Sequence, residues 1–175
     1  GRLGDNEVAR IGWGPNKLTK TRENVAFIRS AVAAGVQMID TAHLYTGGQS
    51  EETVGEALSP FPEGCVVATK GGFGGAGRGR PEVLRAELDQ SLRHLRTGSI
   101  HLYYLHPVDP ETPIEESIAT LRAYRDQGKV RHAGISDSLL RLSVGIEEGD
   151  DLLRDLDAGL ERAGVVKTSK RRVPA

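Results

Sequence analysis

The sequence predicts an α/β fold built on parallel strands. Short apolar runs alternate with amphipathic segments that have the 3.6-residue period of helices. One run, at 65–69, is apolar throughout, which is typical of a parallel strand covered on both faces. Four of the runs end in a polar residue, at positions 40, 70, 106 and 136. Each interval between them is long enough for a helix and two loops, the content of a βα unit.

The strands are predicted from apolar runs bounded by turn residues. They occupy residues 8–14, 36–40, 65–69, 100–105 and 130–135. A further apolar run, at 139–146, begins only a few residues beyond the fifth strand, whereas a parallel crossover needs a dozen or more residues. We therefore expect that run to lie outside the parallel series, with a helix following at about 150–163.

The first two helices are predicted from periodicity and from their end residues. A helix over 22–34 ends before Gly35, a residue favoured just beyond helix ends. Ser50 is predicted to cap a short second helix. Glu51 and Glu52 would lie in its first turn, where the helix dipole favours carboxylates.

The next two helices begin at proline. Pro81 opens the third helix at a position that proline favours, and leucines at helical spacing give it a buried stripe. Thr112, Pro113 and Glu115 form a capping box for the fourth helix, which ends near Gly128. Strand and helix thus alternate as far as residue 135.

Composition and charge narrow the classes of function. The net charge is −1, which gives no electrostatic case for nucleic acid or for an anionic membrane surface. No apolar run approaches the roughly 18 residues that span a bilayer. Cys65 is the single cysteine, which favours a reduced compartment and predicts a cytoplasmic location.

Polar residues at the strand ends form the candidate site. Asp40, Lys70, His106 and Ser136 each close an apolar run, and Tyr45 lies in the loop after Asp40. The carboxyl ends of parallel strands meet on one face of a sheet. We therefore expect these side chains to lie on one rim.

The residue types on this rim suit the reduction of a carbonyl group. Hydride addition needs an acid that protonates the forming alkoxide. A free tyrosine has a pKa near 10, too high for efficient acid–base catalysis, and a neighbouring lysine cation lowers it. A carboxylate can hold that lysine, and a histidine can orient the substrate oxygen. Tyr45, Lys70, Asp40 and His106 supply these four roles.

Each of these residues also has a purely structural interpretation. Asp40 could bond its own loop, Lys70 could be a solvated strand end, and Tyr45 could cover a loop. His106 precedes Pro107 and could be a turn residue. The combination of four such types at strand ends favours the site.

The segment 72–77 matches the pattern G-x-G-x-x-G directly after a strand. A dinucleotide fingerprint must also open the helix and be followed by an acidic residue at the end of the next strand. Here the helix starts only at Pro81, and the next strand ends in His106. We predict a flexible loop that shapes substrate access, with Arg78 and Arg80 solvated. The remaining histidines lack metal-ligand spacing, so no metal site is expected.

Several segments resemble the aldo-keto reductase family: RIGWG, GVQMIDTAHLYTGGQSEETVGEAL, VVATKGG, LYYLHPVD and TPIEESIATLRAYRDQGKVRHAGIS. The resemblance covers residues 1–137. It implies the first five strands and four helices of a (β/α)8 TIM barrel. A complete barrel needs about 250 residues, so the resemblance implies a truncated barrel.

The resemblance also implies roles for individual residues. Tyr45 would be the general acid, Lys70 and Asp40 its tuning pair, and His106 the residue that orients the carbonyl. Ser136 matches a serine beside the nicotinamide, and Asp137 stands where the family usually has asparagine. The implied cofactor is NADP(H), or sometimes NAD, and the implied substrate is a small aldehyde or ketone.

The remaining residues have a different resemblance. Residues 138–163 are similar to the C-terminal strand and helix of pyridoxal-phosphate enzymes of cysteine and methionine metabolism, in which a residue matching Arg141 binds the substrate carboxylate. An ordinary amphipathic hairpin and helix is the alternative. Residues 164–175 form a basic tail that we expect to be flexible.

Three functions follow as hypotheses. The first is NADPH-dependent reduction of an aldehyde or ketone. The second is a catalytically impaired, chimeric remnant that acts as an oligomeric scaffold and self-associates through open sheet edges. The third is a piece of a pyridoxal-phosphate enzyme. Because the family places phosphate-binding contacts on later strands, we expect this chain alone to bind NADPH poorly. The sequence does not identify the substrate.

Overall fold

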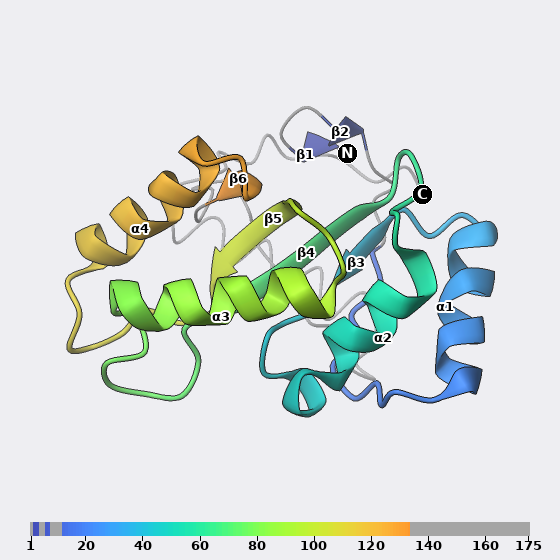
Figure 1. Cartoon of the computed structure of the whole chain (residues 1–175), viewed down its shortest axis with the longest axis horizontal. Coiled ribbons are helices and arrows are strands. Elements are labelled where there is room, and N and C mark those ends of the chain that lie inside the picture. Colours follow the sequence, from blue (N-terminus) through green and yellow to red (C-terminus); the bar gives the residue numbers. More distant parts are fainter. Residues whose placement is uncertain (1, 4–5, 8–11, 134–175) are drawn as a thin grey trace, which may run out of the picture. The chain divides into compact units, whose positions relative to one another are not determined.

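The computed structural model describes residues 2–3, 6–7 and 12–133. Near the amino terminus, β1 (Arg2–Leu3) and β2 (Asn6–Glu7) pair as a short antiparallel ribbon that the sequence did not predict. The following elements alternate between helices and strands (Figure 1): α1 (Arg22–Ala33), β3 (Met38–Asp40), the 3-10 helix η1 (Tyr45–Gly48), α2 (Gln49–Leu58), β4 (Val66–Gly71), α3 (Pro81–His94), β5 (Ile100–Leu105), α4 (Ile114–Asp126) and β6 (Val130–Ala133).

The central sheet contains four parallel strands in the order β3-β4-β5-β6. This confirms the predicted α/β class with parallel strands. The register pairs Asp40 with Ala68, and Lys70 with Tyr104. The strands therefore run in sequence order across the sheet, and their carboxyl ends share one edge.

The predicted first strand differs from the structure. Its residues 8–11 lie outside the described residues, and the remainder forms only an isolated parallel bridge between Trp13 and Ile39. The Trp13 N–H donates to the Met38 carbonyl at 2.9 Å, and the Asp40 N–H donates to the Trp13 carbonyl at 2.9 Å. The ring of Trp13 meets Phe27 of α1 edge to face. Trp13 thus hydrogen-bonds to the edge of β3 that faces away from β4.

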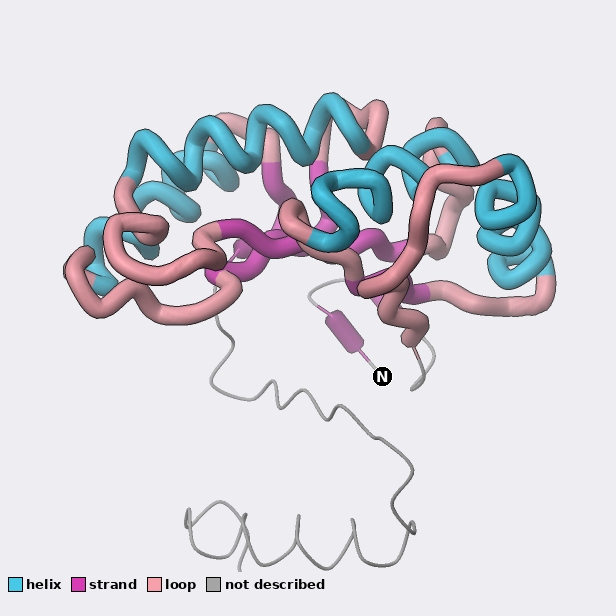
Figure 2. Tube along the Cα trace, turned by 90° about the horizontal axis from the view of Figure 1, so that it is seen from below, coloured by secondary structure: helices cyan, strands magenta, loops and turns pink. Residues whose placement is uncertain are grey.

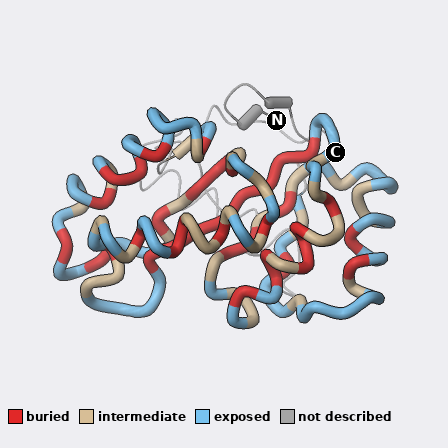
Figure 3. The backbone as a smooth tube through the Cα atoms, viewed as in Figure 1, coloured by how far each residue is buried: buried red, intermediate tan, exposed pale blue. Residues whose placement is uncertain are grey.

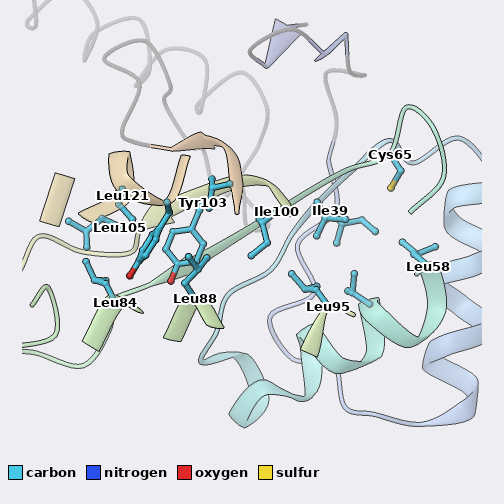
Figure 4. Close-up of a cluster of buried hydrophobic side chains, with 14 of the residues drawn as sticks. Ile39, Leu58, Cys65, Leu84, Leu88, Leu95, Ile100, Tyr103, Leu105 and Leu121 are labelled. Atoms are coloured by element: carbon cyan, nitrogen blue, oxygen red, sulfur yellow. The ribbon is translucent and has the colours of Figure 1, made fainter. Parts of the chain in front are cut away.

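The four helices cover one face of the sheet, as Figure 2 shows. The hydrophobic core lies between these layers, and burial in Figure 3 follows the strands and the inward sides of the helices. In Figure 4, Leu84 and Leu88 of α3 pack beside Tyr103 of β5. Residues 66–69 of β4 are buried, as the apolar run at 65–69 predicted, and Lys70 and Gly71 at its end are buried as well. This strand therefore has packed neighbours on both faces.

Two predicted helix caps are wrong. Gly48, with φ of +93°, occupies the cap position before α2, and the Ser50 hydroxyl donates instead to the Pro15 carbonyl at 2.8 Å. At α4 the cap position is Pro113, which forms no side-chain cap bond, and the Thr112 hydroxyl donates to Asp109. The Ser50 hydroxyl is thus taken by a residue 35 positions away, whereas the Thr112 hydroxyl bonds a carboxylate three residues before it. The start of α3 at Pro81 was predicted correctly.

The predicted segments 138–163 and 164–175 lie outside the described residues. Among the helices that are described, none is long and apolar enough to cross a membrane.

Candidate active site

Three of the predicted site residues lie where neighbouring strands end. Asp40 is the last residue of β3, Lys70 is the penultimate residue of β4, and His106 directly follows β5. Backbone bonds continue the ladder past the strand ends, because the His43 N–H donates to the Lys70 carbonyl at 2.9 Å and the His106 N–H donates to the Gly71 carbonyl at 2.8 Å. The parallel sheet thus brings the three positions to one edge.

The lysine is held by two oxygen atoms. Lys70 Nζ lies 2.8 Å from Asp40 Oδ1 and donates to the Thr41 carbonyl at 2.5 Å. The side chains of Lys70 and Asp40 are only 5% and 16% exposed. A buried ammonium group needs such partners because burial removes its hydration. Both partners come from the end of β3, so these two contacts hold the Lys70 side chain against that strand end.

Tyr45 begins η1 and lies over the lysine. Lys70 Nζ is 5.0 Å from the centroid of the Tyr45 ring. The ring of Tyr45 also meets the ring of His106 nearly edge on, with centroids 6.0 Å apart and planes at 81°. A phenol, an ammonium group and an imidazole thus lie in one cluster, with Asp40 bonded to the lysine.

The turn that carries Tyr45 depends on left-handed backbone. Thr46 and Gly47 have φ of +49° and +64°, and Thr46 is a residue type that rarely adopts such a value. The Thr46 hydroxyl donates to the Leu18 carbonyl at 2.5 Å, which helps to hold this conformation. The turn therefore helps to place the ring of Tyr45 next to Lys70 at the strand ends.

Phe73 is a neighbour of the site that the sequence did not single out. Its ring lies 4.9 Å from that of His106, and its side chain is 47% exposed. Phe73 belongs to the glycine-rich loop that follows β4. Its place in a loop predicted to shape access was the only signal, because nothing in the local pattern distinguishes this aromatic residue from others.

The glycine-rich loop is anchored by two carboxylates. Glu87 of α3 accepts the Gly72 N–H at 2.6 Å and pairs with the guanidinium of Arg78. The side chain of Arg78, predicted to be solvated, is 40% exposed, but the sequence did not predict that it binds this nearly buried carboxylate. Arg78 Nε also donates to the Phe73 carbonyl at 3.1 Å, which ties Phe73 to the same anchor.

Asp109 forms the second anchor. Its carboxylate accepts the N–H groups of Gly77 and Gly79 at 3.0 and 2.8 Å, and that of Glu111 at 2.9 Å. The Thr112 hydroxyl donates to it at 2.6 Å. These hydrogen bonds, that of Thr112 foremost, hold the pKa of Asp109 well below its usual range. Asp109 is thus a loop anchor that the sequence did not reveal, since its partners are mostly backbone groups.

Two predicted site residues, Ser136 and Asp137, lie outside the described residues. For metals, no group of three or more His, Cys, Asp or Glu side chains within the described ranges is arranged to hold an ion. Two of the histidines have other surroundings. The imidazole of His94 pairs with the carboxylate of Glu51. Burial of the His101 side chain lowers its pKa below the usual value for histidine.

Comparison with known proteins identifies the family. A model of the aldo/keto reductase family matches residues 8–144. Probable aldo-keto reductase 1 of Glycine max is 33% identical over 146 residues, which cover 75% of this chain and 42% of that protein. Two solved structures extend the comparison to the fold.

The glycerol dehydrogenase of Gluconobacter oxydans is 34% identical, with a TM-score of 0.66 over 74% of this chain and 45% of that one. An aldo/keto reductase from Klebsiella pneumoniae, solved in complex with NADP and acetate, is 27% identical, with a TM-score of 0.64 over 74% of this chain and 46% of that one. The chain therefore spans less than half the length of these three proteins.

The family match continues past the boundary predicted at residue 137. The comparisons give no support to a pyridoxal-phosphate segment at 138–163. The parallel sheet and its helices match part of an aldo-keto reductase barrel over about three quarters of the chain. This chain belongs to the aldo/keto reductase family.

Proposed function

We propose that this chain carries the acid–base residues of an NADP(H)-dependent reductase of aldehydes or ketones. One observation carries the proposal: Lys70 Nζ lies 2.8 Å from Asp40 and 5.0 Å from the ring centroid of Tyr45. The resemblance to the aldo/keto reductase family implies an acid and a tuning pair at these positions, and the proximity of the three side chains supports the proposal.

The proposed proton donor is the phenol of Tyr45. As negative charge develops on the carbonyl oxygen, the Tyr45 hydroxyl transfers its proton to that oxygen. The phenolate left behind is stabilised by the ammonium of Lys70, because opposite charges attract and the Lys70 side chain is only 5% exposed. Asp40 keeps the ammonium in place through the 2.8 Å ion pair.

His106 is proposed to orient the substrate. Its ring meets that of Tyr45 edge on, so a carbonyl oxygen that accepts the Tyr45 proton would also lie near the imidazole. A hydrogen bond from His106 would share the developing charge. Phe73, which also packs against His106, restricts the directions in which that ring can turn.

The side chains of Tyr45, Lys70 and His106 are suited to bind and protonate the carbonyl group in a nicotinamide-dependent reduction. When bound, NADPH supplies the hydride that adds to the carbonyl carbon. The resulting alkoxide needs a proton donor, a cation and a hydrogen-bond donor, and Tyr45, Lys70 and His106 are of these three types. NADP is proposed as the cofactor because the Klebsiella pneumoniae relative was solved with it. Ser136 and Asp137 lie beyond the described residues, and their contact with the nicotinamide stays a prediction.

The test is NADPH-dependent reduction of a test aldehyde by the full chain. We expect Tyr45→Phe to lower turnover by about 10²- to 10⁴-fold, because the change removes the proton donor while preserving the ring. Tyr124→Phe is the matched control, since Tyr124 lies in the core on α4 and its ring is equally preserved. Unchanged turnover in Tyr45→Phe would show that another group supplies the proton.

A further inference from the structure

Two neighbouring residues of β4 point to opposite sides of the sheet, as strand geometry requires. Lys70 contacts Asp40 on the candidate active-site side. Thr69 lies on the helix side, where its hydroxyl donates to Glu51 Oε1 of α2 at 2.5 Å. Thr69 and Glu51 are both fully buried. The strand that carries the lysine is therefore bonded to α2 directly beside that lysine.

The second oxygen of Glu51 is also engaged. His94 Nδ1, at the end of α3, lies 3.2 Å from Glu51 Oε2. The imidazole reaches this position because Gly48 has no side chain: a Cβ at position 48 would lie 2.6 Å from His94 Cε1. Glu51 thus joins α2, β4 and α3 at one point. A fully buried carboxylate that binds groups from two other elements is a costly feature for a surface helix to carry.

The position of Glu51 along the chain links it to the candidate acid. In sequence, α2 directly follows η1, which begins at Tyr45, and the left-handed residues Thr46, Gly47 and Gly48 make the turn between Tyr45 and α2. A bond from the first turn of α2 to β4 therefore ties the segment that bears Tyr45 to the strand that bears Lys70.

The adjacent residue, Ser50, forms a second tie. Its hydroxyl lies 2.8 Å from the Thr41 hydroxyl, and the Thr41 carbonyl accepts a hydrogen bond from Lys70. Ser50 and Glu51 thus connect one helical turn to both strand ends that surround the lysine.

We propose that Glu51 is a positioning residue that, through Thr69, sets the separation between Tyr45 and Lys70. It contacts neither the substrate nor the cofactor. This inference rests on the proposed function, in which proton transfer from Tyr45 depends on the nearby ammonium. A misplacement of about 1 Å between reacting groups can cost on the order of 100-fold in rate, so loss of the bond between α2 and β4 should lower turnover.

Variants at Thr69 test the proposal, because removing Glu51 itself would leave His94 without its carboxylate and could prevent folding. Thr69→Val preserves the shape of the side chain but removes its hydroxyl, and Thr69→Ser preserves the hydroxyl. The matched control is Thr53→Val, since the buried Thr53 hydroxyl donates only within its own helix, to the Gln49 carbonyl.

In the full chain we expect Thr69→Val to lower kcat for a test aldehyde by roughly 10- to 100-fold. The KM for NADPH should not change, and Thr69→Ser and Thr53→Val should stay near wild type. A role in packing alone predicts the opposite order at position 69, with valine tolerated and serine impaired. That order, or equal kcat values for Thr69→Val and Thr53→Val, would overturn the proposal.

A second readout does not require activity. The rate of reductive methylation of Lys70, followed by peptide mass spectrometry, reports how firmly Asp40 and Thr41 hold the ammonium. We expect Lys70 to react roughly fivefold faster in Thr69→Val, the change that the loss of one net hydrogen bond produces. Lys129, whose side chain is 36% exposed, should react at an unchanged rate in all variants and serves as the reference lysine.

The two readouts separate the inference from the proposed function. If the wild type reduces no carbonyl compound while Lys70 reacts faster in Thr69→Val, the proposed function fails and the positioning role of Glu51 stands. If the wild type is active but Lys70 reacts at the same rate in Thr69→Val and Thr53→Val, the positioning role is refuted.

Discussion

Breaking the Asp40–Lys70 ion pair should destabilise the fold far more than breaking the Lys129–Asp89 pair. The two pairs are matched in chemistry and in length, with N–O distances of 2.8 and 2.9 Å. They differ in burial: the side chains of Asp40 and Lys70 are 16% and 5% exposed, whereas those of Asp89 and Lys129 are 40% and 36% exposed. The comparison therefore isolates the effect of burial.

The magnitude follows from the distance and the surroundings. At 2.8 Å and an effective dielectric constant of about 20, two unit charges attract by about 6 kcal/mol. Desolvation of both groups offsets part of this attraction, and removing one partner from a buried pair typically costs about 3–5 kcal/mol. We therefore expect a coupling free energy of about 3 kcal/mol for Asp40 and Lys70. Exposed pairs contribute about 0.2–1 kcal/mol, so the second pair should stay below about 1 kcal/mol.

The measurement is a double-mutant cycle by urea unfolding of the full chain. One cycle uses Asp40→Asn and Lys70→Met, and the other uses Asp89→Asn and Lys129→Met. Because each double variant lacks both charges, the coupling energy reports the pair and not a leftover ion. Equal coupling energies in the two cycles would refute the reasoning, since distance alone would then decide the strength of these pairs.

Two further predictions concern close packing and acid stability. We expect Gly55→Ala to lower the free energy of unfolding by about 1–3 kcal/mol in urea titrations, because a Cβ there would overlap the carbonyl oxygen of His94. Gly98→Ala, with nothing within 4 Å, should stay near wild type. The depressed pKa of Asp109 predicts a contribution to stability that is present above about pH 4 and is lost as pH falls toward its folded-state value. The difference in unfolding free energy between wild type and Asp109→Asn should therefore shrink as pH falls from about 5 to about 2, and a constant difference would contradict this assignment.

Features that depend on nearby residues were predictable from the sequence. The strand over 100–105 and the helix start at Pro81 agree with the structure, because an apolar run and a proline act through their immediate neighbours. The common edge for Asp40, Lys70 and His106 also followed from the sequence, since parallel strands in sequence order must end on the same side. Their catalytic roles stay a prediction.

Features that depend on distant partners were not predictable. The sequence explained Glu51 only by the dipole of its own helix, yet this residue is fully buried, and its partners lie 18 and 43 residues further along the chain. The sequence also did not predict the ion pair of Arg78 with Glu87, because Glu87 belongs to the next helix. Local spacing carries no information about such partners. The hydrogen bonds between β4 and the helices that cover it were therefore not predicted.

The loop between β4 and α3 has fixed ends and an open middle. Glu87 holds Gly72, and Asp109 holds Gly77 and Gly79, whereas a Cβ on Gly75 would meet nothing within 4 Å. Extra residues inserted at Gly75 would therefore lengthen the loop while leaving both anchors bonded. Natural variation or laboratory design can thus change the size of this loop independently of the strand that precedes it, and the helix that follows would keep its starting point.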